Sequence, residues 1–353
     1  MYLSGPEAHT PSRQRSPGGA MSASTFHAER PTVAAYQGAV AADPRFDLAG
    51  LRCPTLTTTV PKELVHRAAV AEVMLTDWQR EDDTRFRVEA QWPRSHSFFT
   101  PIDGEYHDPL MVAETIRQIG SLLGHAEFGV PFGHHFLLWD FDLTIHPECL
   151  DVRWTPASLD IEITCSEVKR RGASLAGLTY ESAVRREGQL VATGRISYTC
   201  VSPAVYERLR PERVFSEDHR PLPLTAPTAP QSVGRTSPAD VVLSPIGERN
   251  RWQLRLDSRH PVLFDHPVDH VPGMVLLEAA RQGAAAALDR SSFLPLSINS
   301  SFKRYAELDE PCFIEAHRLC PATPGGEETV RVTGHQGGEL VFSSLVTAAP
   351  QSG

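Results

Sequence analysis

A Glu-x-x-Arg-Gln motif occurs twice in this chain, and the two copies stand nearly half the chain apart. The copies consist of Glu114, Arg117 and Gln118, and of Glu278, Arg281 and Gln282. Each lies in an apolar segment, HDPLMVAETIRQIGSLLGH in the first half and HVPGMVLLEAARQGAAAAL in the second. Residues three and four apart share one face of a helix, and charged side chains are rarely buried unless they are paired. The repeated pattern therefore indicates a site rather than a solvated surface.

The residue types in this motif point to proton transfer beside an anion-binding group. A carboxylate in an apolar pocket has a raised pKa, so Glu278 and Glu114 are candidate general bases. A guanidinium one turn further along the helix binds phosphate well, which makes Arg281 and Arg117 candidate anion ligands. Glu-x-x-Arg on a helix is more often a surface pair worth about 0.2–0.5 kcal/mol. Its duplication within apolar segments favours the functional interpretation.

The two halves also match in order outside this motif, which indicates an internal duplication. AEVML at 71–75 corresponds to ADVVL at 239–243. RFRVEAQW from Arg85 corresponds to RWQLRLDS from Arg251. Both members of the second pair alternate apolar and polar residues, which predicts a half-buried strand in each half.

Each half is expected to contain one long helix followed by an antiparallel meander. Asp108 and Pro109 are plausible as the N-cap and first residue of the first helix, and Pro272 as the first residue of the second. Strand-like runs follow at 159–164, 175–184 and 190–199, and at 312–318, 329–334 and 340–346. Glu187-Gly188 and Gly337-Gly338 are typical of hairpin turns. Because each helix has few polar positions, we predict an α+β fold in which the sheet wraps around it.

Composition divides the chain into four segments. Residues 1–50 lack periodicity and are rich in Pro, Gly, Ser and Ala, so they are predicted to form a disordered N-terminal extension. Residues 51–201 and 238–349 hold the two repeats. The proline-rich stretch 202–237 is predicted to link them.

Composition and charge also limit the kind of protein. A net charge of −9 without a basic stripe argues against a nucleic-acid ligand. No apolar run approaches the roughly 20 residues of a membrane span, and the polar N-terminus lacks the apolar core of a signal peptide. The six cysteines form no CxxC pair, which favours reduced thiols over zinc or dithiol chemistry. We therefore expect a cytoplasmic protein with neither a nucleic-acid nor a membrane partner.

The histidines are weaker candidates for a site. His134-His135 lies in GVPFGHHF without further ligands at fixed spacing, so a loop role is favoured, and neither a metal nor a cofactor is expected. His107 and His270 each precede a helix, where they can orient a substrate or cap the helix start. His66-Arg67 either belongs to the rim of a pocket or has a purely structural role.

Longer segments carry a resemblance to a known family. The run HPVDHVPGMVLLE, from His266 to Glu278, is similar to hot-dog dehydratases of acyl-carrier proteins and to hot-dog thioesterases. VPKELVHRAAVAEVMLTDW at 60–78, HDPLMVAETIRQ at 107–118 and LFDHPVDHVPGMVLLEAARQ at 263–282 resemble the A-factor biosynthesis family of actinomycetes. The resemblance spans residues 55–348, in both repeats and in order. It implies a tandem hot-dog fold, with an antiparallel sheet wrapped around one long apolar helix in each repeat.

The resemblance also implies a function. Proteins of this family join a β-ketoacyl group, delivered as an acyl-carrier-protein thioester, to the hydroxyl of dihydroxyacetone phosphate. The ester then cyclises to a phosphorylated butenolide, a precursor of γ-butyrolactone, butenolide or furan signalling molecules that control antibiotic production and development. The implied partners are a loaded acyl-carrier protein and dihydroxyacetone phosphate. Arg67 and Arg251 are candidate surface contacts for an acidic carrier protein, although most exposed arginines are simply solvated.

Acyl transfer to an alcohol gives the candidate residues three tasks. Glu278 or Glu114 would take the proton of the hydroxyl. Backbone N–H groups near the helix starts, around Leu110 and Gly273, would stabilise the thioester oxygen. The phosphate and the rest of the substrate would contact Arg281, Arg117, Gln118, Gln282, His270, Lys303 and Arg304. A duplicated fold often keeps one active pocket, and PGMVLLE in the second copy is closer to the hot-dog enzymes, which slightly favours that copy.

Two other functions stay open on the sequence alone. A hot-dog dehydratase or thioesterase would act on similar acyl thioesters, with a β-proton or water in place of the alcohol. Simple dehydration is disfavoured, because the loop from His266 to Gly273 is shorter than in hot-dog dehydratases and Arg281 is added. A non-catalytic acyl-binding protein would bind a fatty-acyl ligand without turnover. Dependence of the rate on dihydroxyacetone phosphate separates these possibilities.

Overall fold

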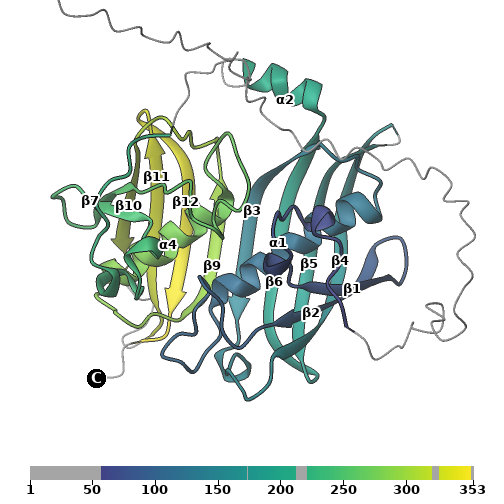
Figure 1. Cartoon of the computed structure of the whole chain (residues 1–353), viewed down its shortest axis with the longest axis horizontal. Helices are drawn as coiled ribbons and strands as arrows, with labels where there is room; N and C mark the ends of the chain where they lie inside the picture. The colour runs from purple at the N-terminus through teal and green to yellow at the C-terminus, as the bar shows by residue number, and fades with distance from the viewer. Residues whose placement is uncertain (1–56, 173, 212–220, 320–325, 351–353) are drawn as a thin grey trace, which may run out of the picture.

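A single antiparallel sheet of twelve strands runs through both halves of the chain (Figure 1). The computed structural model describes residues 57–172, 174–211, 221–319 and 326–350. Within this part of the chain the strand order is β1-β2-β4-β5-β6-β3 in the first half, continued by β9-β12-β11-β10-β8-β7 in the second. Taken inward from its own edge, the second half repeats the strand order of the first, as the duplication predicts.

The elements of the two halves correspond along the chain, apart from α2 and η3 in the first half. The first half contains β1 (Leu75–Arg80), β2 (Arg85–Trp92), α1 (Pro109–Ala126), β3 (His135–Ile145), η3 (Pro147–Cys149), β4 (Ala157–Arg171), β5 (Ser174–Arg186), β6 (Gln189–Val201) and α2 (Pro203–Leu209). The second half contains β7 (Leu243–Pro245), β8 (Arg251–Leu254), α4 (Gly273–Ala287), β9 (Pro295–Phe302), β10 (Cys312–Arg318), β11 (Glu328–Gln336) and β12 (Glu339–Ala348). Short 3-10 helices precede the first strand of each half, namely η1 (Lys62–Val65) and η2 (Val70–Glu72), and η4 (Pro230–Val233) and η5 (Pro238–Asp240).

The two strands that join the halves are absent from the sequence prediction. β3 and β9 directly follow the two long helices and pair with each other, with Phe141 opposite Ser300 and Leu143 opposite Ile298. The expected strands β4, β5, β6, β10, β11 and β12 are confirmed. The sequence of β9, PLSINSSF, has no clear alternation of apolar and polar residues. Its pairing depends on a strand far away in the chain, which a local pattern does not reveal.

The helices α1 and α4 contact each other and lie on the same side of the sheet (Figure 1). Most side chains of α1 are buried, as expected for a helix that the sheet wraps around. α1 begins as predicted, because Asp108 is its N-cap, Pro109 is its first residue and the Asp108 carboxylate accepts the Leu110 N–H at 2.8 Å. α4 begins one residue later than predicted, with Pro272 as its N-cap.

Two tyrosine hydroxyls fix α1 to the sheet. The Tyr180 hydroxyl donates to the Ile116 carbonyl at 2.6 Å, and the Tyr198 hydroxyl donates to the Gly120 carbonyl at 2.8 Å. A Cβ atom at Gly120 would lie 2.9 Å from the Tyr180 hydroxyl oxygen. Glycine at this position therefore allows the helix to approach β5 and β6 closely.

The two predicted hairpin turns are confirmed. Glu187 and Gly188, between β5 and β6, have φ angles of 52° and 79°. Gly337 and Gly338, between β11 and β12, have φ angles of 58° and 82°. Positive φ at both central residues is typical of a type I′ turn, whose twist matches that of the strands it connects.

The division of the chain into an extension, two repeats and a linker stays a prediction. The predicted extension, residues 1–50, lies outside the described residues. Within the predicted linker, the Leu222 N–H donates to the Leu308 carbonyl at 3.0 Å, and the Thr228 N–H donates to the Leu243 carbonyl at 2.8 Å. Residues 222–228 therefore run along the second repeat before η4 begins.

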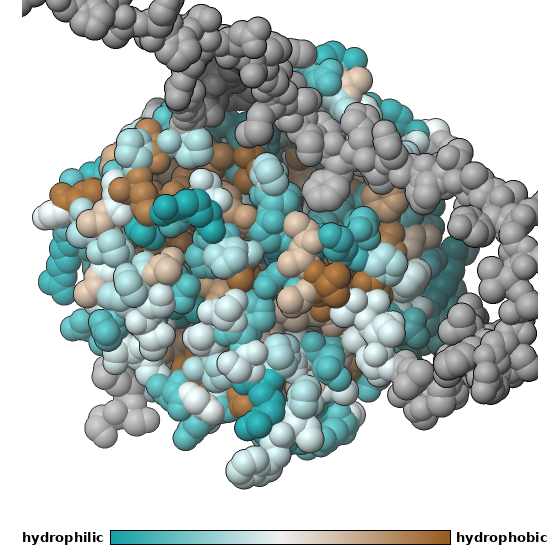
Figure 2. Space-filling view, in the orientation of Figure 1, coloured by the Kyte–Doolittle hydropathy of each residue, from teal (hydrophilic) through white to brown (hydrophobic). Residues whose placement is uncertain are grey.

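The face in Figure 2 is predominantly polar, with hydrophobic residues in small groups. Among the described residues, Trp154 is the most exposed large hydrophobic side chain, at 90%, and the Arg94 guanidinium lies 5.9 Å from its ring centroid. Among the described helices, none has the length and apolar character needed to cross a membrane.

Replacing Tyr180 by Phe should lower the free energy of unfolding by about 1 kcal/mol, because α1 loses a buried hydrogen bond to the sheet. Urea denaturation followed by circular dichroism measures the change. Tyr305→Phe is the matched control, since the buried Tyr305 hydroxyl has no hydrogen-bond partner among the described residues. Equal losses of stability in the two variants would contradict a stabilising role for the hydrogen bond from Tyr180 to α1.

Candidate functional site

Glu114 is fully buried, and two arginines hold its carboxylate. Nε and Nη2 of Arg67 lie 2.9 and 2.6 Å from the two carboxylate oxygens. Nε and Nη2 of Arg117, one turn along α1, lie 2.9 and 2.7 Å from them. We call Arg67, Glu114, Arg117, Gln118 and Asp265 the first cluster.

Glu278 on α4 is held in the same way. Nε and Nη2 of Arg235 each lie 2.7 Å from a Glu278 oxygen, and those of Arg281 lie at 3.0 and 2.7 Å. We call Arg235, Glu278, Arg281, Gln282 and Asp108 the second cluster. Burying an ion pair is favourable only where the geometry and further hydrogen bonds offset the lost hydration. The forked guanidinium contacts of both clusters meet that requirement.

Gln118 and Gln282 tie each glutamate to the backbone that leads into the first strand of its repeat. In each case the side-chain amide donates to the carboxylate and to a backbone carbonyl, while its oxygen accepts a backbone N–H, at distances between 2.5 and 3.0 Å. The partners are Glu114, Glu72 and Met74 for Gln118, and Glu278, Asp240 and Val242 for Gln282. Both glutamines thus position the carboxylates, and their predicted contact with substrate stays a prediction.

Each cluster contains groups from both halves of the chain. Arg67 Nη1 donates to the Val262 carbonyl of the second repeat at 3.1 Å. Arg235 Nη1 donates in the opposite direction, to the Phe98 carbonyl of the first repeat, at 2.7 Å. The two contacts are reciprocal, so the candidate sites exist only where the repeats meet.

A second carboxylate from the opposite half accompanies each arginine. Asp265 lies 3.3 Å from Arg67 Nη1, and Asp108 lies 3.4 Å from Arg235 Nη1. Burial would raise the pKa of Asp265, but the hydrogen bond from His266 and the charge of Arg67 lower it. Burial raises the pKa of Asp108 and is only partly opposed by Arg235. The pKa of this second acid is therefore shifted in opposite directions in the two clusters.

Two histidines hold the loops that cross between the halves. In each, Nδ1 accepts two backbone N–H groups of its own loop at 3.1–3.2 Å, and Nε2 faces an acid at 3.3–3.4 Å. The partners are Phe98, Phe99 and Glu72 for His96, and Val262, Leu263 and Asp240 for His260. No motif in the sequence points to either histidine, although both occupy the same place in their repeats.

The expectation of a raised pKa for the two glutamates is wrong. Burial acts to raise the pKa of Glu114, but Arg117 and Arg67 outweigh it and lower the pKa to about 2. For Glu278, Arg235 and Arg281 likewise outweigh the effect of burial and lower the pKa to about 2. Guanidinium groups at hydrogen-bond distance stabilise the charged carboxylate. Both glutamates are therefore ionised at neutral pH, and neither has the pKa of an effective general base.

The two clusters differ in their access to solvent. The Arg117 side chain is 25% exposed, whereas that of Arg281 is 2% exposed. Arg235 is also 2% exposed, so solvent does not reach the charged groups of the second cluster. The sequence slightly favours the second copy as the active one, while this exposure favours the first.

Two of the roles expected at the helix starts are wrong. Asp108 caps α1, so His107 does not, and α4 has no side-chain cap, so His270 does not cap that helix. The Leu110 N–H already donates to the Asp108 carboxylate and is not available to a thioester oxygen. His107 is instead a buried ring 5.4 Å from that of Trp92, and burial lowers its pKa to about 4.

His270 and Gly273 lie at the start of α4 but outside the second cluster. His270 Nδ1 lies 2.7 Å from Asp269 Oδ1 and 3.4 Å from the Tyr206 hydroxyl. A Cβ atom at Gly273 would lie 3.4 Å from Leu138, so the first turn of α4 packs on β3. Their predicted contacts with substrate stay predictions.

Lys303 and Arg304 lie at the surface, outside both clusters. Arg304 pairs with Glu339 at 3.0 Å, with both side chains more than 60% exposed. The backbone N–H of the exposed Lys303 donates to the Val341 carbonyl at 2.8 Å. The structure therefore does not bring these two cations to the buried glutamates, and their predicted contact with the substrate stays a prediction.

Arg67 and Arg235 are cluster residues that the repeated motif does not reveal. Of the roles expected for Arg67, a surface contact for a carrier protein is wrong, because its side chain is 7% exposed and paired with Glu114. A structural role or a place at the rim of a pocket stays open for it. Arg235 lies in the predicted linker. Each arginine precedes one of the aligned segments 71–75 and 239–243 by four residues. Extending that alignment backwards would have matched the two arginines.

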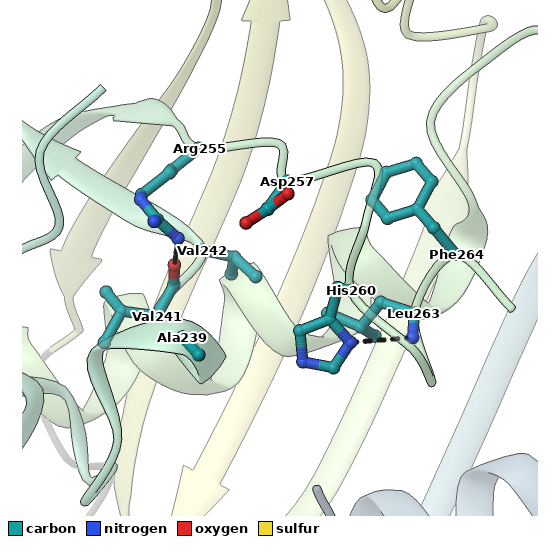
Figure 3. A pocket seen from close by; sticks show the side chains of 8 residues that line it. All are labelled: Ala239, Val241, Val242, Arg255, Asp257, His260, Leu263 and Phe264. Atoms are coloured by element: carbon teal, nitrogen blue, oxygen red, sulfur yellow. Dashed lines mark hydrogen bonds between the residues drawn. The ribbon is translucent and has the colours of Figure 1, made fainter. Parts of the chain in front are cut away.

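A small pocket lies in the second repeat (Figure 3). Its lining consists of Ala239, Val241, Val242, Arg255, Asp257, His260, Leu263 and Phe264. Figure 3 shows the Arg255 side chain donating to the Val241 carbonyl and the His260 ring accepting the Leu263 N–H. None of the lining residues belongs to a cluster, so this pocket is not the candidate site. Among the described residues, no group of three or more His, Cys, Asp or Glu is placed to hold a metal ion.

An antiparallel sheet wrapped around one long buried helix, built twice in tandem, defines a double hot-dog protein. The A-factor biosynthesis hotdog domain matches residues 51–202 and 216–351 of the chain. The match covers both repeats, and the chain belongs to the A-factor biosynthesis family.

Several curated relatives carry the name 2-oxo-3-(phosphooxy)propyl 3-oxoalkanoate synthase. The protein from Streptomyces virginiae is 56% identical over 291 residues, covering 82% of this chain and 98% of that protein. The protein from Streptomyces coelicolor is 44% identical over 294 residues, covering 83% and 93%. The chain is also similar to the solved structure of an acyl-ACP thioesterase from Bacteroides thetaiotaomicron, at 12% identity and a TM-score of 0.44, covering 76% of this chain and 99% of that one.

Replacing Glu278 by Gln should lower the free energy of unfolding at neutral pH by about 3–5 kcal/mol, because two buried guanidinium groups lose their shared carboxylate. Chemical denaturation measures the difference. Glu148→Gln is the matched control, since the Glu148 side chain is 71% exposed and should contribute little. A Glu278 variant as stable as this control would contradict the account of the cluster.

The stabilisation by Glu278 should also depend on pH. Its pKa in the folded protein is about 2, below the ordinary value of 4.5. The stabilisation is therefore complete above about pH 4.5 and is lost as the pH falls towards 2. The difference in unfolding free energy between the wild type and Glu278→Gln should shrink over this range. A difference that does not change with acidification would be the contrary result.

Proposed function

We propose that this chain transfers a 3-oxoacyl group from a thioester to the hydroxyl of dihydroxyacetone phosphate. The product would be the ester in the name of its relatives, a 2-oxo-3-(phosphooxy)propyl 3-oxoalkanoate. The observation that carries this proposal is the 56% identity to one such synthase over 98% of its length. The site geometry then indicates which groups would hold the phosphorylated acceptor.

The first cluster suits a phosphate group. Among the described residues, Glu114 and the Val65 carbonyl contact Nε and Nη2 of Arg117, which leaves Nη1 for a ligand. A guanidinium that a buried carboxylate already orients loses little side-chain freedom when it binds phosphate. We therefore assign the phosphate to Arg117, and Glu114 positions that arginine.

Glu278 and Arg281 form the equivalent arrangement in the second repeat, where both side chains are buried. A catalytic role for this pair, which the sequence favours, would require the second cluster to open. We assign the pair to the interface between the repeats, where it holds Arg235 against the Phe98 carbonyl. Substitution of Arg117 and of Arg281, each in turn, separates the two assignments.

The transfer itself needs no group beyond a thioester, an alcohol and a base. The hydroxyl oxygen attacks the thioester carbonyl carbon, the new C–O bond forms, the C–S bond breaks and the proton ends on the thiol. A backbone N–H at the start of α4, near Gly273, stays our candidate for stabilising the carbonyl oxygen as it becomes negative. The ionised Glu114 is a poor base for the proton.

The carrier of the acyl group and the location of the protein are also part of the proposal. We propose an acyl-carrier protein as the thioester donor, in the cytoplasm, and a phosphorylated butenolide signal precursor as the later product. Arg251 is 35% exposed at the surface, where it pairs with Glu248 and Glu315, and it stays a candidate contact for the carrier. Cys149, Cys165, Cys200 and Cys312 are buried free thiols, which supports a reducing compartment.

Mass spectrometry of the purified protein with a 3-oxoacyl thioester tests the proposed reaction. A phosphorylated ester or butenolide should form only when dihydroxyacetone phosphate is also present. Release of the free acid or a dehydrated acyl group without the acceptor would instead indicate a hot-dog hydrolase or dehydratase. Binding without any turnover, across several chain lengths and with a carrier-bound thioester, would indicate an acyl-binding protein.

Replacing Arg117 by Ala should lower kcat/KM for dihydroxyacetone phosphate by roughly 10- to 100-fold, because a charge-assisted contact to the phosphate is lost. Unphosphorylated dihydroxyacetone should show little further loss. Arg281→Ala is the matched variant in the second cluster, and it should reduce stability without this selectivity for the phosphate. Selective loss of the phosphorylated acceptor in Arg281→Ala would move the substrate to the second cluster.

A further inference from the structure

Asp265 and His266 form a hydrogen-bonded pair at the edge of the first cluster. Asp265 Oδ1 lies 2.5 Å from His266 Nδ1. The other Asp265 oxygen accepts the Ala68 N–H at 2.8 Å, and Arg67 Nη1 lies 3.3 Å from Oδ1. The Asp265 side chain is 2% exposed, so contacts with two other residues fix the carboxylate that orients the ring.

This hydrogen bond sets the tautomer of His266. An ionised carboxylate can only accept a hydrogen bond, so the ring nitrogen that faces it must carry the proton. The proton of His266 therefore lies on Nδ1 and the lone pair on Nε2. The His266 side chain is 30% exposed, so a substrate can reach the ring from solvent. An imidazole held in this way by a carboxylate can take a proton from a hydroxyl and return it to a leaving group.

Asp265 also connects this pair to Arg117, the phosphate-binding arginine of the proposed function. Arg67 Nη1 lies 3.3 Å from Asp265, and Arg67 and Arg117 both contact the Glu114 carboxylate. Burial first, and then the charges of His125, Arg117 and His266, lower the pKa of the neighbouring His66 to about 3. The charged and titratable groups near His266 include Asp265 on its own loop, His66 and Arg67 after η1, and Arg117 on α1.

The second cluster lacks an equivalent pair. His260 and His96 hold the corresponding loops, and the pair follows His260 by five and six residues. The same positions after His96 are Pro101 and Ile102, neither of which has a side chain that accepts a proton. The two clusters therefore differ in this acid–histidine pair as well as in the exposure of Arg117 and Arg281.

We propose that His266, oriented by Asp265, is the general base of the acyl transfer and that the first cluster is the catalytic one. The acceptor hydroxyl gives its proton to Nε2 as its oxygen bonds to the thioester carbonyl carbon. The C–S bond then breaks, and the departing sulfur takes the proton from Nε2, so atoms and charge balance. This inference rests on the proposed function, because it names the group that carries that reaction's proton.

Steady-state kinetics of His266→Asn test the inference, with a 3-oxoacyl pantetheine thioester and dihydroxyacetone phosphate as substrates. The kcat should fall by roughly 100-fold or more, with a much smaller change in KM for the acceptor. The pH profile of kcat should also change relative to that of the wild type. In a His266→Ala variant, added imidazole should restore part of the activity.

His317→Asn is the matched control, since His317 is a 67% exposed histidine that pairs with Glu315 outside both clusters, and its kinetics should match the wild type. A His266→Asn enzyme within about threefold of wild-type kcat would overturn the inference. So would a loss of activity that leaves the pH profile unchanged and that imidazole does not rescue, because this would indicate a structural role. His266→Gln provides a second variant if the first fails to fold. A wild type that forms no ester would refute the proposed function itself, and the base assignment with it.

Discussion

The burial of two carboxylates among four guanidinium groups, where the repeats meet, is the interaction on which the rest of the structure depends. Glu114 and Glu278 are both fully buried, and each is ionised because two arginines outweigh the effect of burial on its pKa. The arginine that precedes the first strand of each repeat also reaches a backbone carbonyl of the other repeat. The ion pairs therefore fix the relative placement of α1, α4 and the crossing loops, and neither repeat can complete its cluster alone.

Duplication gives two nearly identical environments, and small substitutions then separate their roles. Arg117 reaches solvent, whereas Arg281 is sealed. The loop beside the first cluster carries Asp265 and His266, where the other loop has Pro101 and Ile102. One cluster can thus stabilise the interface while the other exposes a cation and a base to substrate. The scaffold constrains both, because the β3–β9 pairing holds the two halves in one sheet.

Much of the fold can be predicted from the sequence, because its strongest signals are local. The apolar helices, the N-cap at Asp108 and the turns at Glu187-Gly188 and Gly337-Gly338 follow from side-chain and backbone preferences. β3 and β9 cannot be found in this way, since their burial comes from pairing with a distant strand. The motif locates the buried glutamates and one arginine beside each, but their pKa also depends on Arg67 and Arg235, which lie far from them in sequence and reach them only in the folded chain.

A crystal structure with dihydroxyacetone phosphate and an unreactive 3-oxoacyl thioester analogue would test the central claim most directly. The account predicts the phosphate in ion-pair contact with Arg117 and the acceptor hydroxyl in hydrogen-bond contact with Nε2 of His266. The second cluster should keep the closed ion pairs between Glu278 and its two arginines. A phosphate bound to Arg281, or an acceptor hydroxyl directed at Glu278, would contradict the account and place the reaction in the second repeat.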